Sequence, residues 1–518
     1  MPESRYSSLR PVKGGLTWLR EPLSGTLGEG SAELDGHPQR ASLERFDLER
    51  RQAAEIVREL DWYAASGDGT RLVVSDHGDL RVLPSGPKDD GDDSGDSVTV
   101  DLSRARYLAD PVALWRHAYD EAGRIMRHDF WAADMAGVDW AAALDAYRPL
   151  LDRIAGAADF ADLLWEVFGE LGTSHAYVRE APDDRDGGDG TVGLLGADLE
   201  RDAGGVWRIA RVLPGESSDP RARSPLTAPG VNVRPGDGLR AVDGRPVDPQ
   251  AGPGPLLVGS RGVPVELAVS PADGGDPRRV VVVPLDDESR LRYQDWVAGR
   301  RRAVRELGGG RIGYLHVPDM MGEGWAHFHR DLRLEMTHDA LIVDVRGNRG
   351  GHVSELVVEK LARRVLGWDV PRGLRPSTYP QDARRGPVVA LADEFAGSDG
   401  DVVTAAIRIL RLGPVVGART WGGVIGIEGS PVLVDGTAMT VPRYPFWMEG
   451  YGWNLENHGV EPDVEVLATP GDWAAGRDPQ LETAVRIALD ALAARPAAAP
   501  PDTQDRPSKR RPPLPPRA

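Results

Sequence analysis

The sequence predicts a multidomain protein of mixed α and β structure, with a helical module, a small β domain and an α/β domain in that order. From residue 102 to 180 the apolar residues recur with a helical period. Residues 190–288 read as short strands separated by turn signals, and residues 290–490 alternate strand and helix. A chain of 518 residues has room for about three or four such domains.

The N-terminal segment, residues 1–100, precedes these domains. Residues 1–50 are rich in Gly, Ser, Arg and Glu and show no clear period. Residues 59–74 read as strand, Asp-Gly turn and strand, and residues 78–83 add another strand. This rhythm resembles a remnant of one β-propeller blade, which cannot bury its own faces alone. The acidic, glycine-rich residues 84–98 then predict a linker.

The helical module is expected to span residues 101–186. Its predicted helices run through Leu108 to Tyr119, Trp140 to Tyr147 with Leu150 to Ile154, and Asp159 to Leu171. Gly172 closes the last helix, and the chain then turns into a strand through Thr173, Ser174 and His175. This turn therefore places a hydroxyl and an imidazole side by side.

The small β domain is expected to span residues 188–289. A Pro235-Gly236-Asp237 turn, an apolar strand and an Asp243-Gly244 turn together resemble a PDZ domain. PDZ domains bind extended peptides by adding a strand to a sheet edge. An unrelated small β-barrel is the alternative.

The α/β domain is expected to span residues 290–492, followed by a disordered, proline-rich tail at 493–518. Its predicted elements are Ile312–Val317, Ala340–Val345, Val353–Leu366, Val388–Leu391, Val402–Leu412, Val415–Val416 and Leu481–Leu492. The arrangement is similar to that of crotonases and tail-specific proteases.

Composition excludes several classes of function. The charge of −18, from 62 basic and 80 acidic residues, argues against nucleic acid as the main partner. The absence of cysteine excludes disulfides, thiol catalysis and thiolate metal sites. No apolar run is long enough to span a membrane and no secretory h-region follows Met1, which predicts a cytoplasmic location. We expect neither a cofactor nor a membrane partner.

A strand–turn–helix pattern surrounds Ser398. The apolar run from Pro387 to Leu391 precedes the glycine-flanked turn, and the helical run from Val402 to Leu410 follows it. Ser398 therefore lies at the first turn of a helix, where free N–H groups and the helix dipole favour negative charge. This is suitable for a nucleophile whose attack creates an oxyanion. The alternative is a serine that only caps the helix.

Further segments supply a base and oxyanion donors. His175 is a candidate base, although a lone histidine is more often structural. The Arg346–Gly351 loop offers backbone N–H groups at its paired glycines, and the N–H of Asp399 offers a second donor. Glu456 is an acid in a loop, and His458 close to it is a rival base that the sequence leaves open.

A metal site is not expected. His327 and His329 form a pair one residue apart, but no third ligand clusters with them.

Four motifs occur in a fixed order along the chain: Gly-Thr-Ser-His, Arg-Gly-Asn-x-Gly-Gly, Ala-Gly-Ser-Asp-Gly-Asp and Glu-Asn-x-Gly-Val-x-Pro-Asp. The PDZ-like domain lies between the first two. This ordered set closely resembles the C-terminal half of tricorn proteases. The resemblance covers residues 100–490. It implies a cytoplasmic serine peptidase, assembled as a hexamer, that hydrolyses short peptides left by upstream proteolysis. Typical members carry two propellers ahead of this half.

The resemblance also implies a role for individual residues. Ser398 matches the nucleophile, His175 the general base and Ser174 the hydroxyl that contacts this histidine. Glu456 matches the acid that polarises Ser174, and Gly351 and Asp399 match the oxyanion donors. Asp369 matches the carboxylate that receives a basic P1 side chain of the substrate, and in the family this carboxylate comes from a neighbouring subunit.

Two other interpretations compete with this one. A tail-specific protease uses a serine–lysine dyad, but the only lysine after Ser398 is Lys509 in the predicted disordered tail. A non-catalytic scaffold that binds peptides through the PDZ-like domain is the alternative from another class, and the joint presence of Ser398, His175 and Glu456 argues against it.

Overall fold

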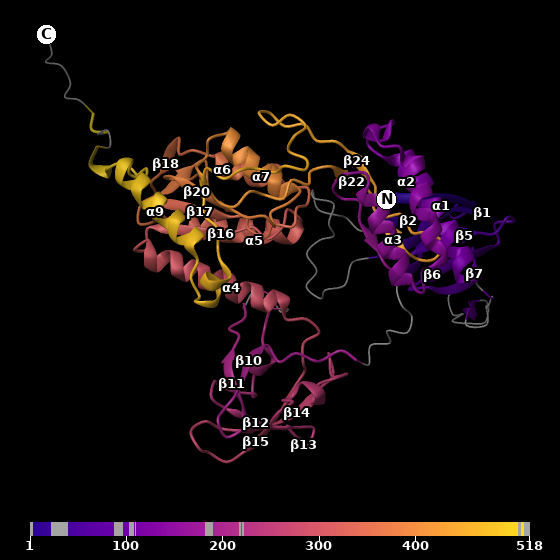
Figure 1. Cartoon of the computed structure of the whole chain (residues 1–518), viewed down its shortest axis with the longest axis horizontal. Helices are drawn as coiled ribbons and strands as arrows, with labels where there is room; N and C mark the ends of the chain where they lie inside the picture. The colour runs from indigo at the N-terminus through magenta and orange to yellow at the C-terminus, as the bar shows by residue number, and fades with distance from the viewer. Residues whose placement is uncertain are drawn as a thin grey trace, which may run out of the picture. The chain divides into compact units, whose positions relative to one another are not determined.

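The computed structural model describes residues 4–21, 40–86, 97–102, 108, 110–181, 190–216, 219, 222–505 and 509–511. The chain forms two compact units, Met1–Leu114 and Trp115–Ala518 (Figure 1). Among the helices of these described ranges, none is both long and apolar enough to cross a membrane.

The first unit contains two four-stranded antiparallel sheets. The strands are β1 (Arg5–Val12), β2 (Gly15–Glu21), β3 (Ala41–Asp47) and β4 (Gln52–Leu60), then β5 (Trp62–Ala65), β6 (Arg71–Asp76), β7 (Asp79–Pro84) and β8 (Val98–Val100). Buried residues of both sheets, among them Leu43 and Leu72, share one apolar core. The linker predicted at 84–98 falls largely on residues 87–96, which lie outside the described residues.

The first sheet is the main difference from the sequence prediction, which found one blade-like segment and no period before residue 50. Polar residues occupy buried positions in β2 and β3 and disrupt the apolar alternation. Buried Glu44 accepts a hydrogen bond from the Trp18 indole at 2.9 Å, and buried Arg45 pairs with Asp47 at 2.7 Å. Both partners offset the cost of burying the charges. The Glu44–Trp18 bond joins two strands and is set by strand pairing, whereas Arg45 and Asp47 lie two residues apart on β3.

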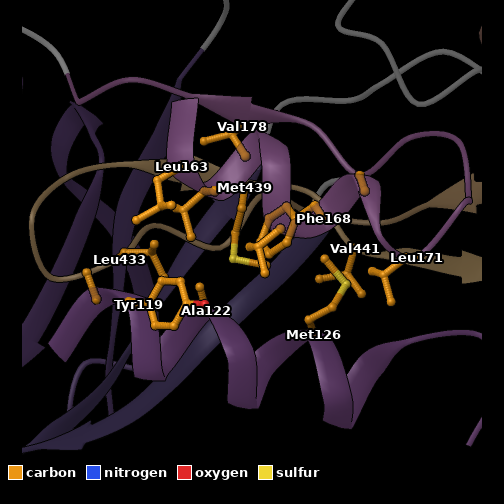
Figure 2. Packing of buried hydrophobic residues seen from close by; sticks show 14 of the residues in the cluster. Tyr119, Ala122, Met126, Leu163, Phe168, Leu171, Val178, Leu433, Met439 and Val441 are labelled. Atoms are coloured by element: carbon orange, nitrogen blue, oxygen red, sulfur yellow. The ribbon is translucent and has the colours of Figure 1, made fainter. Parts of the chain in front are cut away.

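The helical module consists of α1 (Pro111–Asp129), α2 (Trp140–Tyr147) and α3 (Ala157–Gly169), followed by the short strand β9 (Val178–Arg179). Strand β9 pairs with β23 (Ala438–Met439), which comes from the far end of the chain. Figure 2 shows Leu433, Met439 and Val441 packed among residues of α1 and α3 such as Met126 and Phe168. The helical module therefore completes its core with the segment that precedes Glu456.

The small β domain has the sheet order β10-β11-β12-β14-β15, with β13 paired to β12. The strands are β10 (Ala197–Arg201), β11 (Trp207–Val212), β12 (Gly238–Val242), β13 (Arg245–Pro246), β14 (Val265–Ser270) and β15 (Arg278–Val282). Asp243 and Gly244 both have positive φ, 47° and 73°, as a tight two-residue hairpin turn requires.

The α/β domain is built on a five-stranded parallel sheet of order β16-β17-β20-β21-β25. Its strands are β16 (Ile312–His316), β17 (Ala340–Asp344), β20 (Val388–Ala392), β21 (Val415–Gly417) and β25 (Val464–Glu465). The helices are α4 (Ser289–Leu307), α5 (Gly322–Glu335), α6 (Ser354–Ala362), α7 (Asp399–Ile409), α8 (Pro470–Ala474) and α9 (Pro479–Ala494). Helices α4 and α9 lie beside the sheet (Figure 1). Buried side chains of both helices, such as Val304 and Leu481, pack on it.

Two-stranded pairs extend from this domain. They are β18 (Gly367–Asp369) with β19 (Ser377–Tyr379), and β22 (Gly426–Ile427) with β24 (Pro442–Tyr444). Helix α6 ends at Ala362, earlier than the predicted Leu366, because Leu366 donates its N–H to Tyr379 in the first pair at 2.8 Å.

The prediction of disorder from residue 493 is wrong at its start. Helix α9 continues to Ala494, and Ala498 and Arg385 exchange two hydrogen bonds, at 2.8 and 2.9 Å. Ala497 packs against the core of the α/β domain, so apolar contact holds this part of the tail. Residues 506–508 and 512–518 lie outside the described residues.

Candidate active site

Ser398 lies at the turn between strand β20 and helix α7. Its backbone has φ 56° and ψ −121°, a conformation that non-glycine residues rarely adopt. It occupies the N-cap position, but its side chain makes no capping hydrogen bond. The hydroxyl is therefore not used to satisfy the helix, unlike that of a serine that only caps. Strain of this kind costs about 1–3 kcal/mol and is concentrated at functional sites.

The Arg346–Gly351 loop packs directly against this turn. A Cβ on Gly350 would lie 2.4 Å from the Cβ of Ser398, so only glycine permits the approach. Asn348 is buried and accepts two hydrogen bonds. Its backbone carbonyl accepts the N–H of Gly397 at 3.0 Å, and its side-chain Oδ1 accepts the N–H of Gly350 at 2.9 Å. These bonds fix the loop and the serine turn to each other.

Two backbone N–H groups at this junction remain open. Within the described ranges, neither the N–H of Gly351 nor that of Asp399 has a hydrogen-bond partner. The side chain of Asp399 accepts from the Ser354 N–H at 3.1 Å. Open donors beside a serine at a helix N-terminus are suited to a developing oxyanion.

A hydrogen-bonded chain joins Glu456, Ser174 and His175. The Glu456 carboxylate accepts the Ser174 N–H at 2.7 Å and the Ser174 hydroxyl at 3.1 Å. The Ser174 Oγ lies 2.8 Å from Nδ1 of His175. Residues 282 positions apart are thus brought into contact by the packing of the helical module on the C-terminal segment. The chain leaves Nε2 of His175 as the ring nitrogen that faces away from Ser174.

The surroundings of His175 favour its neutral form. Its side chain is buried, and its ring centroid lies 5.5 Å from those of both Tyr177 and Trp421. This burial lowers the pKa of His175 below its usual 6.5, while the charge of Glu456 opposes the shift. A histidine that is neutral at neutral pH can accept a proton.

Trp421 joins the histidine to the serine turn. The same indole that borders His175 lies against Gly397, whose Cβ, if present, would be 2.5 Å from the ring. The backbone N–H of Trp421 donates to the Ala396 carbonyl at 3.0 Å. His175 and the turn that carries Ser398 therefore border one side chain.

Other candidate residues lie apart from this group. His458 is exposed and contacts Glu461 at 3.6 Å and Arg419 at 3.5 Å. Asp369 is exposed at the end of β18, where its backbone pairs with Ser377, and the described residues include no hydrogen-bond or ion-pair partner for its carboxylate. His327, on α5, stacks on Tyr293.

No metal centre is evident in the described part of the chain. Among those residues, no three His, Asp or Glu side chains form a group able to hold a metal ion.

Sequence reasoning missed three residues of the site. Thr440 donates its hydroxyl to the carbonyl of His175 at 2.5 Å, and Trp421 borders the imidazole. Asp401 accepts two backbone N–H groups next to Trp421. Only Asp401 had a local signal, because an acid three residues after an N-cap serine is the spacing of a capping box.

Three family models match the chain. They are the tricorn protease C1 domain at residues 111–169, the tricorn protease PDZ domain at 193–287 and peptidase family S41 at 311–466. The α/β domain thus matches peptidase family S41, and the small β domain that precedes it is a PDZ domain of the tricorn protease type. The predicted PDZ domain and the mixed, multidomain fold are thereby confirmed.

Individual proteins narrow this class. The chain is 59% identical to tricorn protease homolog 1 of Streptomyces coelicolor over 96% of its own length and 47% of that protein. It is 32% identical to the tricorn protease of Thermoplasma acidophilum, over 94% of this chain and 44% of that protein. A crystal structure of the tricorn protease superposes with a TM-score of 0.84 at 31% identity, covering 94% of this chain and 46% of that one. The chain belongs to the tricorn protease family, and it spans about half the length of these relatives.

Proposed function

We propose that this chain is the catalytic half of a serine peptidase that hydrolyses short peptides through an acyl-enzyme. The observation that carries the proposal is the Glu456–Ser174–His175 hydrogen-bonded chain, which packs through Trp421 against the turn of Ser398. Such a chain has no evident structural purpose in a scaffold that only binds peptides. A buried, neutral imidazole next to a strained serine is what acyl transfer needs.

In the first step, the Ser398 hydroxyl attacks the scissile carbonyl carbon. Nε2 of His175 takes the hydroxyl proton, because Nδ1 is engaged by Ser174. The carbonyl oxygen becomes an oxyanion and accepts the N–H groups of Gly351 and Asp399. Loss of one such donor typically raises the barrier by about 3 kcal/mol.

In the second step, the imidazolium gives its proton to the leaving amine. The C–N bond breaks, the amine product departs and an ester to Ser398 remains. Water then attacks the ester while His175 again takes a proton, and the returned proton restores the Ser398 hydroxyl. Each turnover therefore consumes one water and releases a free carboxylate and a free amine.

Ser174 and Glu456 serve the histidine. Nδ1–H donates to the Ser174 Oγ, and the Ser174 hydroxyl donates to Oε2 of Glu456. This arrangement fixes the ring tautomer and stabilises the imidazolium, as the acid does in a Ser-His-Asp triad. The backbone N–H groups of Val424 and Ile425 hold the same carboxylate oxygen, at 2.7 and 3.2 Å.

The proposed substrates are oligopeptides with a basic P1 residue, taken from upstream proteolysis in the cytoplasm. Asp369 supports this preference, since its exposed carboxylate stands at the end of a projecting strand pair. In a homo-oligomer, by family resemblance a hexamer, Asp369 of one copy would reach the P1 side chain bound to another. Mass measurement of the protein under native conditions tests the assembly.

Fluorogenic peptides test the activity. The wild type should cleave a peptide with Arg at P1, and Ser398→Ala should abolish cleavage while leaving the far-UV circular dichroism unchanged. If wild type and Ser398→Ala both fail to cleave in a mixture of short peptides, the chain is a peptide-binding scaffold instead.

The P1 preference is tested by Asp369→Ala. The ratio of kcat/KM for Arg over Leu at P1 should fall, while cleavage after Leu persists. An unchanged ratio would remove Asp369 from the specificity site without affecting the proposed peptidase activity.

A further inference from the structure

Asp401 is a buried carboxylate in the first turn of helix α7, which follows Ser398, and the catalytic steps above do not use it. Its side chain is fully buried, 0% exposed. It accepts the N–H of Gly422 at 2.8 Å and that of Gly423 at 3.1 Å. The N–H of Ser398 and the hydroxyl of Thr420 also face this carboxylate. A buried carboxylate that accepts from this many donors is held in one position.

Three of these four donors, on Thr420, Gly422 and Gly423, come from one segment, residues 420–425, which we term the strap. Asp401 holds its beginning, and the Glu456 carboxylate accepts the N–H groups of Val424 and Ile425 at its end. The strap thus connects the helix of the nucleophile with the acid that serves the base.

Trp421 is the side chain that the strap positions. Its indole borders His175, and two glycines lie close to one edge of the ring, at Cε3 and Cζ3. A Cβ on Gly423 would lie 2.3 Å from the ring and one on Gly397 2.5 Å from it. These contacts restrict the position of the indole, although 46% of the residue is exposed.

We propose that Asp401 is a positioning residue: by holding the strap to the Ser398 turn, it keeps Trp421 against His175 and so fixes the imidazole relative to the nucleophile. The inference rests on the proposed peptidase function. It does not assign Asp401 any contact with substrate. Loss of the carboxylate loosens the indole, admits water to His175 and spreads the distance between base and nucleophile.

Asp401→Asn tests the inference, because an amide has the same shape but cannot accept at both of its polar atoms. We expect kcat to fall about 10²-fold with KM little changed, since misplacement by about 1 Å costs that much. Glu335→Gln is the matched control. Glu335 is likewise buried and accepts a backbone N–H, that of Tyr314 at 3.1 Å, but it lies on α5 outside the site. Its variant should retain wild-type kcat.

A second measurement follows the histidine directly. In protein carrying ¹³C-labelled histidine, the His175 signal is assigned by its loss in His175→Gln, and its pKa is measured in each variant. The groups that face the ring are Glu456, Ser174, Tyr177 and Trp421. Asp401→Asn and Trp421→Ala should both raise the pKa of His175, because each admits water to a ring that burial keeps neutral. Glu335→Gln should leave it unchanged.

The outcomes separate the two proposals. Wild-type kcat and an unchanged His175 titration in Asp401→Asn would overturn the positioning role. If Asp401→Asn does not fold, an unchanged titration in Trp421→Ala would overturn it equally. Absence of cleavage by the wild type would refute the peptidase proposal alone, and the titration would still decide whether Asp401 fixes the imidazole.

Discussion

Replacement of Glu456 by glutamine tests the relay with little change of shape. The carboxylate accepts four hydrogen bonds, from the N–H and hydroxyl of Ser174 and from the N–H groups of Val424 and Ile425. All four partners are donors at this carboxylate. Oε1 accepts one of these donors and Oε2 accepts the other three. A glutamine amide presents its oxygen at one of the two positions and its NH₂ group at the other, so donor faces donor at one end.

The expected loss follows from these contacts. A hydrogen bond to a charged group contributes about 1.5–3 kcal/mol, and the bond to the Ser174 hydroxyl is the one that stabilises the imidazolium. A loss of about 3 kcal/mol in the transition state, at about 1.4 kcal/mol per tenfold, lowers kcat/KM about 10²-fold. His175 keeps Nε2, the ring nitrogen that takes the serine proton, so activity is reduced rather than abolished.

The pH profile gives a second signature. Burial lowers the pKa of His175 and the charge of Glu456 raises it, so removing that charge lowers the pKa further. The base is active when neutral, and activity is therefore lost only as the pH falls through this pKa. The acid limb of kcat/KM should move to lower pH in Glu456→Gln while the plateau falls.

The assay is kcat/KM for one fluorogenic peptide between about pH 4 and 9, a range that brackets the usual pKa of histidine. Glu335→Gln serves as control for the loss of a buried carboxylate in the same domain. A wild-type plateau, or an acid limb displaced to higher pH, would refute the reasoning from the hydrogen-bonded chain.

The remaining predictions concern the base and the oxyanion loop. His175→Ala should lower kcat about 10²- to 10⁴-fold, the range for loss of a general base. His458→Ala, at an exposed position, should keep wild-type kcat. The reverse result would make His458 the base. Gly350→Ala should abolish cleavage, because its Cβ would lie 2.4 Å from that of Ser398 at φ +76°. Gly347→Ala is the control, because its φ of +66° is similar but its Cβ would have no atom within 4 Å. It should only lower the stability, by about 1 kcal/mol or somewhat more in the melting transition. Equal activity of Gly350→Ala and Gly347→Ala would contradict the close approach.

Parts of the fold could be predicted because their signal is local. Strands β16, β17 and β20 are buried on both faces, so their sequences are continuous apolar runs. Helix α2 runs from Trp140 to Tyr147, as the sequence predicted. Helices α4 and α5 went unpredicted, since their many charged residues obscure a narrow apolar face.

The sequence by itself determined the motifs, their order and the candidate residues, because turn chemistry and apolar period act over a few neighbouring residues. Only the tertiary structure decided that Glu456 contacts Ser174, since 282 positions separate them and no local pattern encodes their distance. The strained backbone of Ser398 and its unused capping hydroxyl likewise appear only in the tertiary structure, where the Gly350 loop packs closely against the serine turn. Asp401 and Trp421 acquire their place for the same reason: a buried contact exists only after distant segments have packed.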